Sequence, residues 1–156
     1  MNPAHVHLIL NHIPVIGSVV GLLLLIVATA RRSSELKKVS LGVFVVIALI
    51  AIPVYLTGEP AEEVIEHLPG VAKPIIEEHE EMALISAITT VVLGVLALAG
   101  LFISRRSKEV PSWVITISLL LSTVSSGMMG WTANLGGQIR HTETRADFQL
   151  PPSTDK

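Results

Sequence analysis

Hydrophobic positions along the chain gather into four long runs without a charged residue. These runs cover residues 13–30, 39–58, 82–104 and 110–139. Each has close to the roughly 20 residues that a helix needs to cross a bilayer. We therefore predict membrane-spanning helices at about residues 8–30, 39–57, 80–104 and 111–135. The short connections between consecutive spans favour an antiparallel four-helix bundle, so the predicted fold class is an all-α integral membrane protein.

The segment between the second and third spans has a helical pattern of its own. Its apolar residues follow Pro60 at helical spacing, at Ala61, Val64, Ile65 and Leu68. Proline is favoured in the first turn of a helix, and this spacing places the apolar residues on one face. We predict a short helix lying on the membrane surface. From Thr142 the chain is polar and contains prolines, so we expect one four-helix domain, residues 1–141, and a flexible tail, residues 142–156.

The composition agrees with a membrane protein. Half of the residues are hydrophobic and 15% are charged, whereas about a quarter are charged in a typical soluble domain. The absence of cysteine excludes disulfides, thiolate zinc sites, cysteine-ligated iron–sulfur clusters and covalently attached c-type haem. No signal-peptide pattern precedes the first apolar run, so the first helix is expected to be retained.

Basic residues indicate the orientation. Seven of the 11 lysines and arginines lie in the two connectors at residues 31–38 and 105–108. The positive-inside rule places both connectors in the cytoplasm. The N-terminus, the loop at residues 59–81 and the C-terminal tail then face the periplasm, as in a multi-pass protein of a bacterial inner membrane. Trp113 and Trp131, about 27 Å apart along a helix, fall near the two interfaces where tryptophans are enriched.

All six histidines fall on the predicted periplasmic side. His5, beside the terminus, and His67, on the polar face of the short surface helix, are interpreted as ordinary polar surface residues. The other four are candidate ligands: His7, His12, His79 and His141. On a regular helix His7 and His12 point about 140° apart, so they are not expected to bind the same metal.

Small residues line one face of several predicted helices. In the third span a stripe descends from His79 through Ser86, Thr90 and Gly94, and in the fourth span serines recur every fourth residue from Ser118. Such faces allow membrane helices to pack closely. They also leave room between helices for a flat macrocycle. The sequence leaves both interpretations open.

The spacing of the histidines limits the choice of metal. A carboxylate-bridged di-iron site needs Glu-x-x-His pairs and a zinc hydrolase needs His-Glu-x-x-His; neither is present. Copper remains an alternative. Haem b, one or two groups, fits best because it is bound without cysteine by imidazoles projecting from helices. Arg140 and Arg145 are available to pair with haem propionates.

These residues carry a family resemblance. The pattern His7-x4-His12-x-Pro14, the pair Thr57-Gly58, His79, and Gly136-Gly137 followed by His141 resemble a family of small bacterial four-helix membrane proteins, a transmembrane domain of unknown function regarded as haem-binding. The resemblance extends over residues 5–141. It implies that His7, His12, His79 and His141 are functional. Family members usually read His-Pro at the first histidine and His-Phe-Pro at the second, whereas this chain has His7-Leu8 and His12-Ile13-Pro14, which weakens the case for His7.

We therefore expect a membrane-bound, b-type cytochrome-like electron-transfer subunit of a larger respiratory or redox complex. Its expected partners are the lipid bilayer, other membrane subunits, a quinol and a periplasmic c-type cytochrome. Two alternatives are a non-redox accessory subunit and a copper- or zinc-binding protein of the periplasmic face. Catalysis by this chain alone is the weakest hypothesis, because it contains no catalytic triad pattern and no nucleotide motif. No basic patch indicates nucleic acid.

Overall fold

The computed structural model describes residues 2–149, and over that range the chain is helical without a β-strand. The all-α class is therefore confirmed. Part of the predicted tail, residues 150–156, lies outside the described range. The elements are α1 (Pro3–Leu10), α2 (His12–Ala30), α3 (Ser34–Leu56), α4 (Gly58–Ile65), α5 (Lys73–Ser107), α6 (Ser112–Arg140) and the 3₁₀ turn η1 (Thr142–Thr144).

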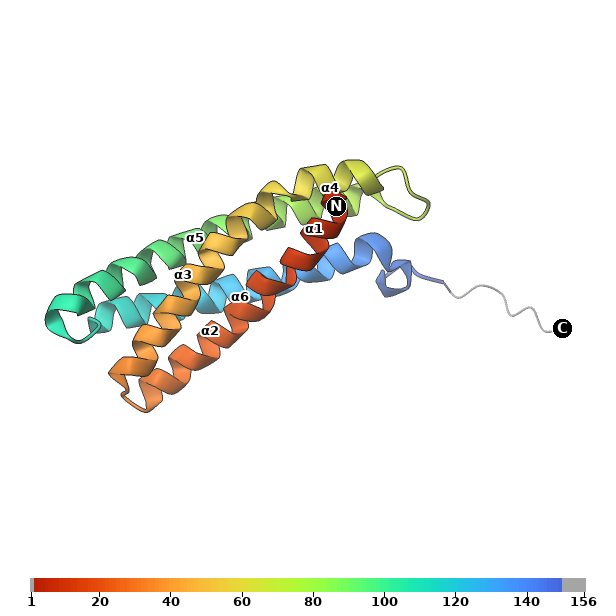
Figure 1. Ribbon diagram of the computed structural model, residues 1–156. Coiled ribbons are helices and arrows are strands. Elements are labelled where there is room, and N and C mark those ends of the chain that lie inside the picture. The colour runs from red at the N-terminus through yellow and green to blue at the C-terminus, as the bar shows by residue number, and fades with distance from the viewer. Residues whose placement is uncertain (1, 150–156) are drawn as a thin grey trace.

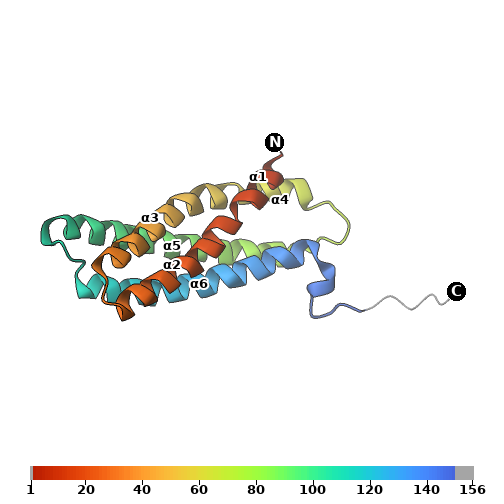
Figure 2. The ribbon, with the colours of Figure 1, turned by 60° about the horizontal axis from the view of Figure 1, so that its bottom comes forward.

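The four long helices lie side by side and close into a ring (Figures 1 and 2). α2 packs on α3, α3 on α5, α5 on α6, and α6 on α2, while the short α1 packs on α4. Four helical segments are each long and apolar enough to cross a membrane. They consist of α1 with α2, α3 with α4, α5 alone and α6 alone. The sequence predicted these four helices correctly.

The two ends of the four packed helices differ in the residues that they carry. One end holds both tight connectors, residues 31–33 and 108–111, and we call it the basic end (Figure 1). The other end holds α1, α4, the connector at residues 66–72 and the segment after α6, and we call it the histidine end. All six histidines lie at this end, because His5 and His7 are in α1, His12 begins α2, His67 is in the connector, His79 is in the second turn of α5 and His141 follows α6. Their predicted gathering at one end of the helices is confirmed.

The first predicted span is divided at Asn11 into α1 and α2. Pro14 has no backbone N–H, so the carbonyl of Leu10 lacks its helical partner at this point. The interruption coincides with the place where α1 leaves the ring and packs on α4. Pro14 itself is buried, three residues after this division.

α5 extends well beyond its apolar run. It has 35 residues and carries Pro74 in its first turn, a position where proline needs no N–H partner. Its length of about 52 Å exceeds the roughly 30 Å of a bilayer hydrocarbon core. The N-terminal turns of α5, including His79, therefore belong to one continuous rod with the apolar part.

Small residues are used for close packing along the middle of the ring. An added Cβ at Gly94 would lie 2.3 Å from the Cβ of Ala48, so α3 and α5 approach as closely as glycine allows. Between α5 and α6, the hydroxyl groups of Thr90 and Ser125 hydrogen-bond at 2.8 Å. Over this stretch the small faces fit against neighbouring helices, as expected for helix packing in membranes.

The outward faces of the four helices are apolar. Large hydrophobic side chains are exposed on each of them, among them Leu23, Leu49, Val95 and Leu120. A soluble protein rarely exposes contiguous apolar area of this kind. This surface is consistent with contact to lipid.

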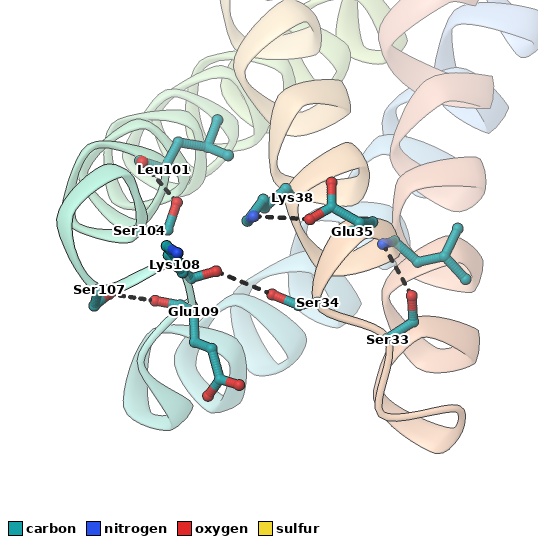
Figure 3. A network of polar contacts seen from close by, with 10 residues as sticks. Ser33, Ser34, Glu35, Lys38, Leu101, Ser104, Ser107, Lys108 and Glu109 are labelled. Atoms are coloured by element: carbon teal, nitrogen blue, oxygen red, sulfur yellow. Dashed lines mark hydrogen bonds and ion pairs between the residues drawn. The ribbon is translucent and has the colours of Figure 1, made fainter.

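Both connectors of the basic end turn on a basic residue in the left-handed conformation. Arg32 has φ 50° and Lys108 has φ 62°. The connectors touch, because the hydroxyl of Ser34 donates to the carbonyl of Lys108 at 3.4 Å (Figure 3). The hydroxyl of Ser33 caps α3 by accepting from the backbone N–H of Leu36. The two connectors thus form one polar surface.

Candidate cofactor site at the histidine end

His7 reaches from α1 to the C-terminal end of α3. Its Nδ1 lies 3.1 Å from the carbonyl oxygen of Val54 and 3.2 Å from Oγ1 of Thr57. A carbonyl oxygen only accepts, so Nδ1 carries the proton and donates. The Thr57 hydroxyl donates its own hydrogen to Val54 at 2.9 Å, which leaves its oxygen free to accept from His7. In the neutral ring the lone pair is then on Nε2.

His79 reaches from the second turn of α5 to α6. Its Nδ1 lies 2.9 Å from the carbonyl oxygen of Thr132, so this ring is also protonated on Nδ1 and has its lone pair on Nε2. The side chain of Thr132 is held in turn by a 2.9 Å hydrogen bond to Ser86. A metal-ligating histidine usually donates its second ring nitrogen to an oxygen acceptor in this way.

His7 and His79 share two features. Both are half-buried. They come from α1 and α5. Nδ1 of His7 is hydrogen-bonded to the backbone of α3, and Nδ1 of His79 to the backbone of α6. The histidine end therefore presents two oriented imidazoles whose Nε2 atoms are available to bind a ligand.

Glycines lie beside both rings. A Cβ added at Gly136 would lie 3.0 Å from Cε1 of His79, and one added at Gly58 would lie 3.9 Å from Cε1 of His7. Gly137 has nothing within 4 Å of such an atom. Thr57-Gly58 thus lies beside His7, and Gly136, the first residue of the pair Gly136-Gly137, lies beside His79.

Replacing Gly136 with alanine is expected to displace the His79 ring. The new methyl group is too close to Cε1, so the bond to Thr132 must lengthen, at a cost of about 0.5–1.5 kcal/mol. Unfolding of the detergent-purified protein, together with the NMR shift of the His79 Cε1 proton, measures this change. Gly137→Ala is the matched control and should leave both unchanged; equal effects of the two substitutions would contradict the geometry.

His12 and His141 are exposed and make local bonds. Nδ1 of His12 donates to the carbonyl of Leu8 at 2.9 Å, and Nδ1 of His141 donates to Glu143 at 2.9 Å. The backbone N–H of Glu143 and, next, the His141 side chain hold the pKa of Glu143 below its usual value. Both Nε2 atoms are accessible, but neither ring is fixed by another long helix. The sequence ranked His12 above His7; in the structure, His7 is the more constrained of the two.

The two histidines interpreted as surface residues differ from these four. His67 is exposed and contacts Glu66 through Nε2 at 3.3 Å, and His5 is exposed on α1. The Nε2 of His67 is thus directed to a neighbouring carboxylate. This arrangement agrees with a surface role.

The two arginines proposed as propionate partners occupy different environments. Arg145 donates to the backbone carbonyls of Gln138, Ile139 and Gly70 at 2.9, 3.2 and 2.7 Å. It fastens the chain after α6 to the end of that helix and to the connector at residues 66–72. Arg140 is exposed at the last position of α6, and no bond of its side chain occurs within residues 2–149. Arg140 is therefore the better placed to pair with an anionic group.

Residues 2–149 contain no cluster of three or more histidine, aspartate or glutamate side chains that could hold a metal ion. Zinc sites normally require three or four protein ligands, whereas a haem iron needs only one or two axial ones. His7 and His79, whose Nδ1 atoms are bonded to backbone carbonyls, are the two half-buried histidines that could supply such ligands through Nε2. The contacts that orient the rings come from backbone carbonyls of Val54 and Thr132, which have no signature in a sequence.

Comparison with known protein families, with curated proteins and with solved structures finds no match to this chain. The resemblance noted from the sequence therefore stays a prediction.

Proposed function

We propose that the chain is a membrane protein in which α2, α3, α5 and α6 form an antiparallel transmembrane bundle. Four long apolar helices and their exposed apolar faces support this placement. The concentration of basic residues in the two connectors favours an orientation with the basic end in the cytoplasm and the histidine end in the periplasm of a bacterial inner membrane.

We further propose that His7 and His79 would hold the iron of a b-type haem at the histidine end. The observation that carries this proposal is that both half-buried rings donate from Nδ1 to a backbone carbonyl of a neighbouring helix. This bond fixes the neutral tautomer, holds the ring plane and raises the basicity of Nε2. A bound haem would supply one-electron transfer.

The residues around the pair have supporting roles in this proposal. Thr57 holds His7 by accepting its Nδ1–H, and Gly136 leaves space for the His79 ring. Arg140, exposed at the same end, supplies a positive charge for a propionate. His12 and His141, with accessible Nε2 atoms, are the candidates for a second haem.

The partners of such a protein follow from where the pair lies. The electron donor is proposed to be a quinol in the bilayer, and the acceptor a periplasmic c-type cytochrome. The glutamate-rich surface of α4 and of the first turns of α5 would attract a positively charged carrier. The protein would then act as an electron-transfer subunit within a larger membrane complex.

An absorption spectrum tests the proposal. The protein, expressed with an adequate haem supply and purified in mild detergent, should show a reduced-minus-oxidised b-type difference spectrum with one or two haems per chain. Metal analysis of the same preparation distinguishes the alternatives. A colourless protein containing copper or zinc would identify a metal-binding protein, and a colourless protein without metal would favour a non-redox accessory subunit; either result overturns the haem proposal.

A further inference from the structure

The basic end concentrates positive charge around a pocket. Seven lysines and arginines but only two acidic residues, Glu35 and Glu109, belong to this end. Within residues 2–149, only one of the seven is in an ion pair, Lys38 with Glu35 at 2.9 Å. The remaining positive charges are therefore available to an external anion.

A pocket of about 440 Å³ lies where the two connectors meet. It is lined by Lys37, Ser107, Glu109, Val110, Pro111 and Ser112. Figure 3 shows the neighbouring contacts, with Ser107 bonded to the Glu109 carbonyl and Ser34 to Lys108. These bonds fix the connector that forms one wall. The pocket thus combines a half-buried lysine and a glutamate with two serines and two apolar residues, Val110 and Pro111.

Aromatic side chains flank this end on the outer surface. Trp113 follows Ser112 and is half exposed, and Phe102 is exposed with the Arg105 guanidinium 5.7 Å above its ring. Tryptophan and arginine side chains of this kind settle at the boundary between hydrocarbon and headgroups. The pocket consequently lies at the level of lipid headgroups if the bundle spans a membrane.

We propose that this pocket binds the headgroup of an anionic phospholipid. Lys37 would contact the phosphate, the hydroxyl group of Ser112 would donate to one of its oxygens, and the acyl chains would follow the apolar faces beside Trp113. Basic pockets between helices at the cytoplasmic side of membrane proteins recognise anionic lipids by this chemistry. The proposal rests on the membrane placement above and is independent of the haem.

The two tryptophans of α6 allow lipid binding to be measured separately near each end of the molecule, because Trp113 lies near the basic end and Trp131 nearer the histidine end. In a Trp131→Phe variant only Trp113, near the basic end, is fluorescent; in Trp113→Phe only Trp131, near the histidine end, remains. Each variant is reconstituted into phosphatidylcholine vesicles containing the same fraction of brominated phosphatidylglycerol or brominated phosphatidylcholine. Quenching by the brominated chains measures how often each lipid lies beside the tryptophan.

Trp113 should show about a fivefold preference for phosphatidylglycerol, the effect expected of one lysine near the lipid surface, and Trp131 should show none. The preference should weaken at high salt. Equal preference at both tryptophans would overturn the proposal. A protein that does not reconstitute into phosphatidylcholine vesicles would instead contradict the membrane placement, and neither result depends on the haem spectrum.

Matched charge changes separate a defined pocket from a diffuse positive surface. Lys37→Gln, inside the pocket, should abolish most of the preference, whereas Arg31→Gln, at the same end of the molecule but outside the pocket, should leave most of it. Glu109→Gln should increase the preference, because it removes a negative charge from the lining. An equal loss in Lys37→Gln and Arg31→Gln would overturn the pocket assignment; the circular dichroism of each variant reports that it is folded.

Discussion

Replacing His79 with alanine is expected to lower the haem content of the purified protein by at least about tenfold, since even loss of a ligand's hydrogen-bond partner commonly costs 10- to 100-fold in metal affinity. The Nε2 atom proposed as a ligand is removed, and no other side chain in α5 replaces it at that position. His7→Ala should have the same effect. Haem per chain, from the absorption of the reduced protein, measures both.

The other histidines serve as controls for this prediction. His5→Ala and His67→Ala remove exposed imidazoles at the same end and should retain the full spectrum. Loss of the spectrum in His12→Ala and His141→Ala, with His7→Ala and His79→Ala intact, would contradict the proposed ligand pair. Thr57→Val, which removes one acceptor of His7 but keeps the Val54 carbonyl, should give an intermediate loss.

Replacing Gly94 with alanine is expected to destabilise the ring of helices by about 1–3 kcal/mol, the usual cost of overpacking. The new methyl group would lie 2.3 Å from the Cβ of Ala48 and 3.4 Å from the carbonyl oxygen of Phe44. The Ala48 Cβ and the backbone atoms beside it belong to α3 and cannot move independently of that helix, so α3 and α5 must separate. Unfolding by denaturing detergent, followed by circular dichroism, measures the loss.

Two further variants test whether this close approach is the cause. Gly42→Ala, in α3, adds a methyl group with nothing within 4 Å, and it should be neutral or slightly stabilising because alanine favours helix over glycine. Ala48→Gly combined with Gly94→Ala removes the clashing methyl group and should restore much of the stability. Failure of the double variant to recover would show that the destabilisation has another origin.

The sequence predicts the four long helices well because each contains a long run of apolar residues. It predicts their limits less well. The apolar run alone places the start of the third span near residue 80, whereas Pro74, a residue favoured in the first turn of a helix, indicates the start that α5 has, at Lys73. The division at Asn11 follows from Pro14, whose effect depends on whether neighbouring helices straighten or redirect the chain.

The candidate site was predictable in its residue types but not in its geometry. Four candidate histidines at one end were evident from their positions, and that His7 and His12 do not share a metal stays a prediction. The distinction between a half-buried His7 and an exposed His12 depends on the packing of α1 on α4, which no local pattern encodes. The carbonyl partners of His7 and His79 are backbone atoms, and any residue type would supply them.

The turns of the basic end illustrate how stability is set against function. Arg32 and Lys108 adopt positive φ, a conformation that costs an L-residue about 1–2 kcal/mol and costs glycine far less. Glycine at either turn would relax the backbone but remove a positive charge. The chain has a basic residue at both turns. The strained backbone at these two residues lowers the free energy of unfolding, while their side chains add to the positive electrostatic potential at one end of the molecule.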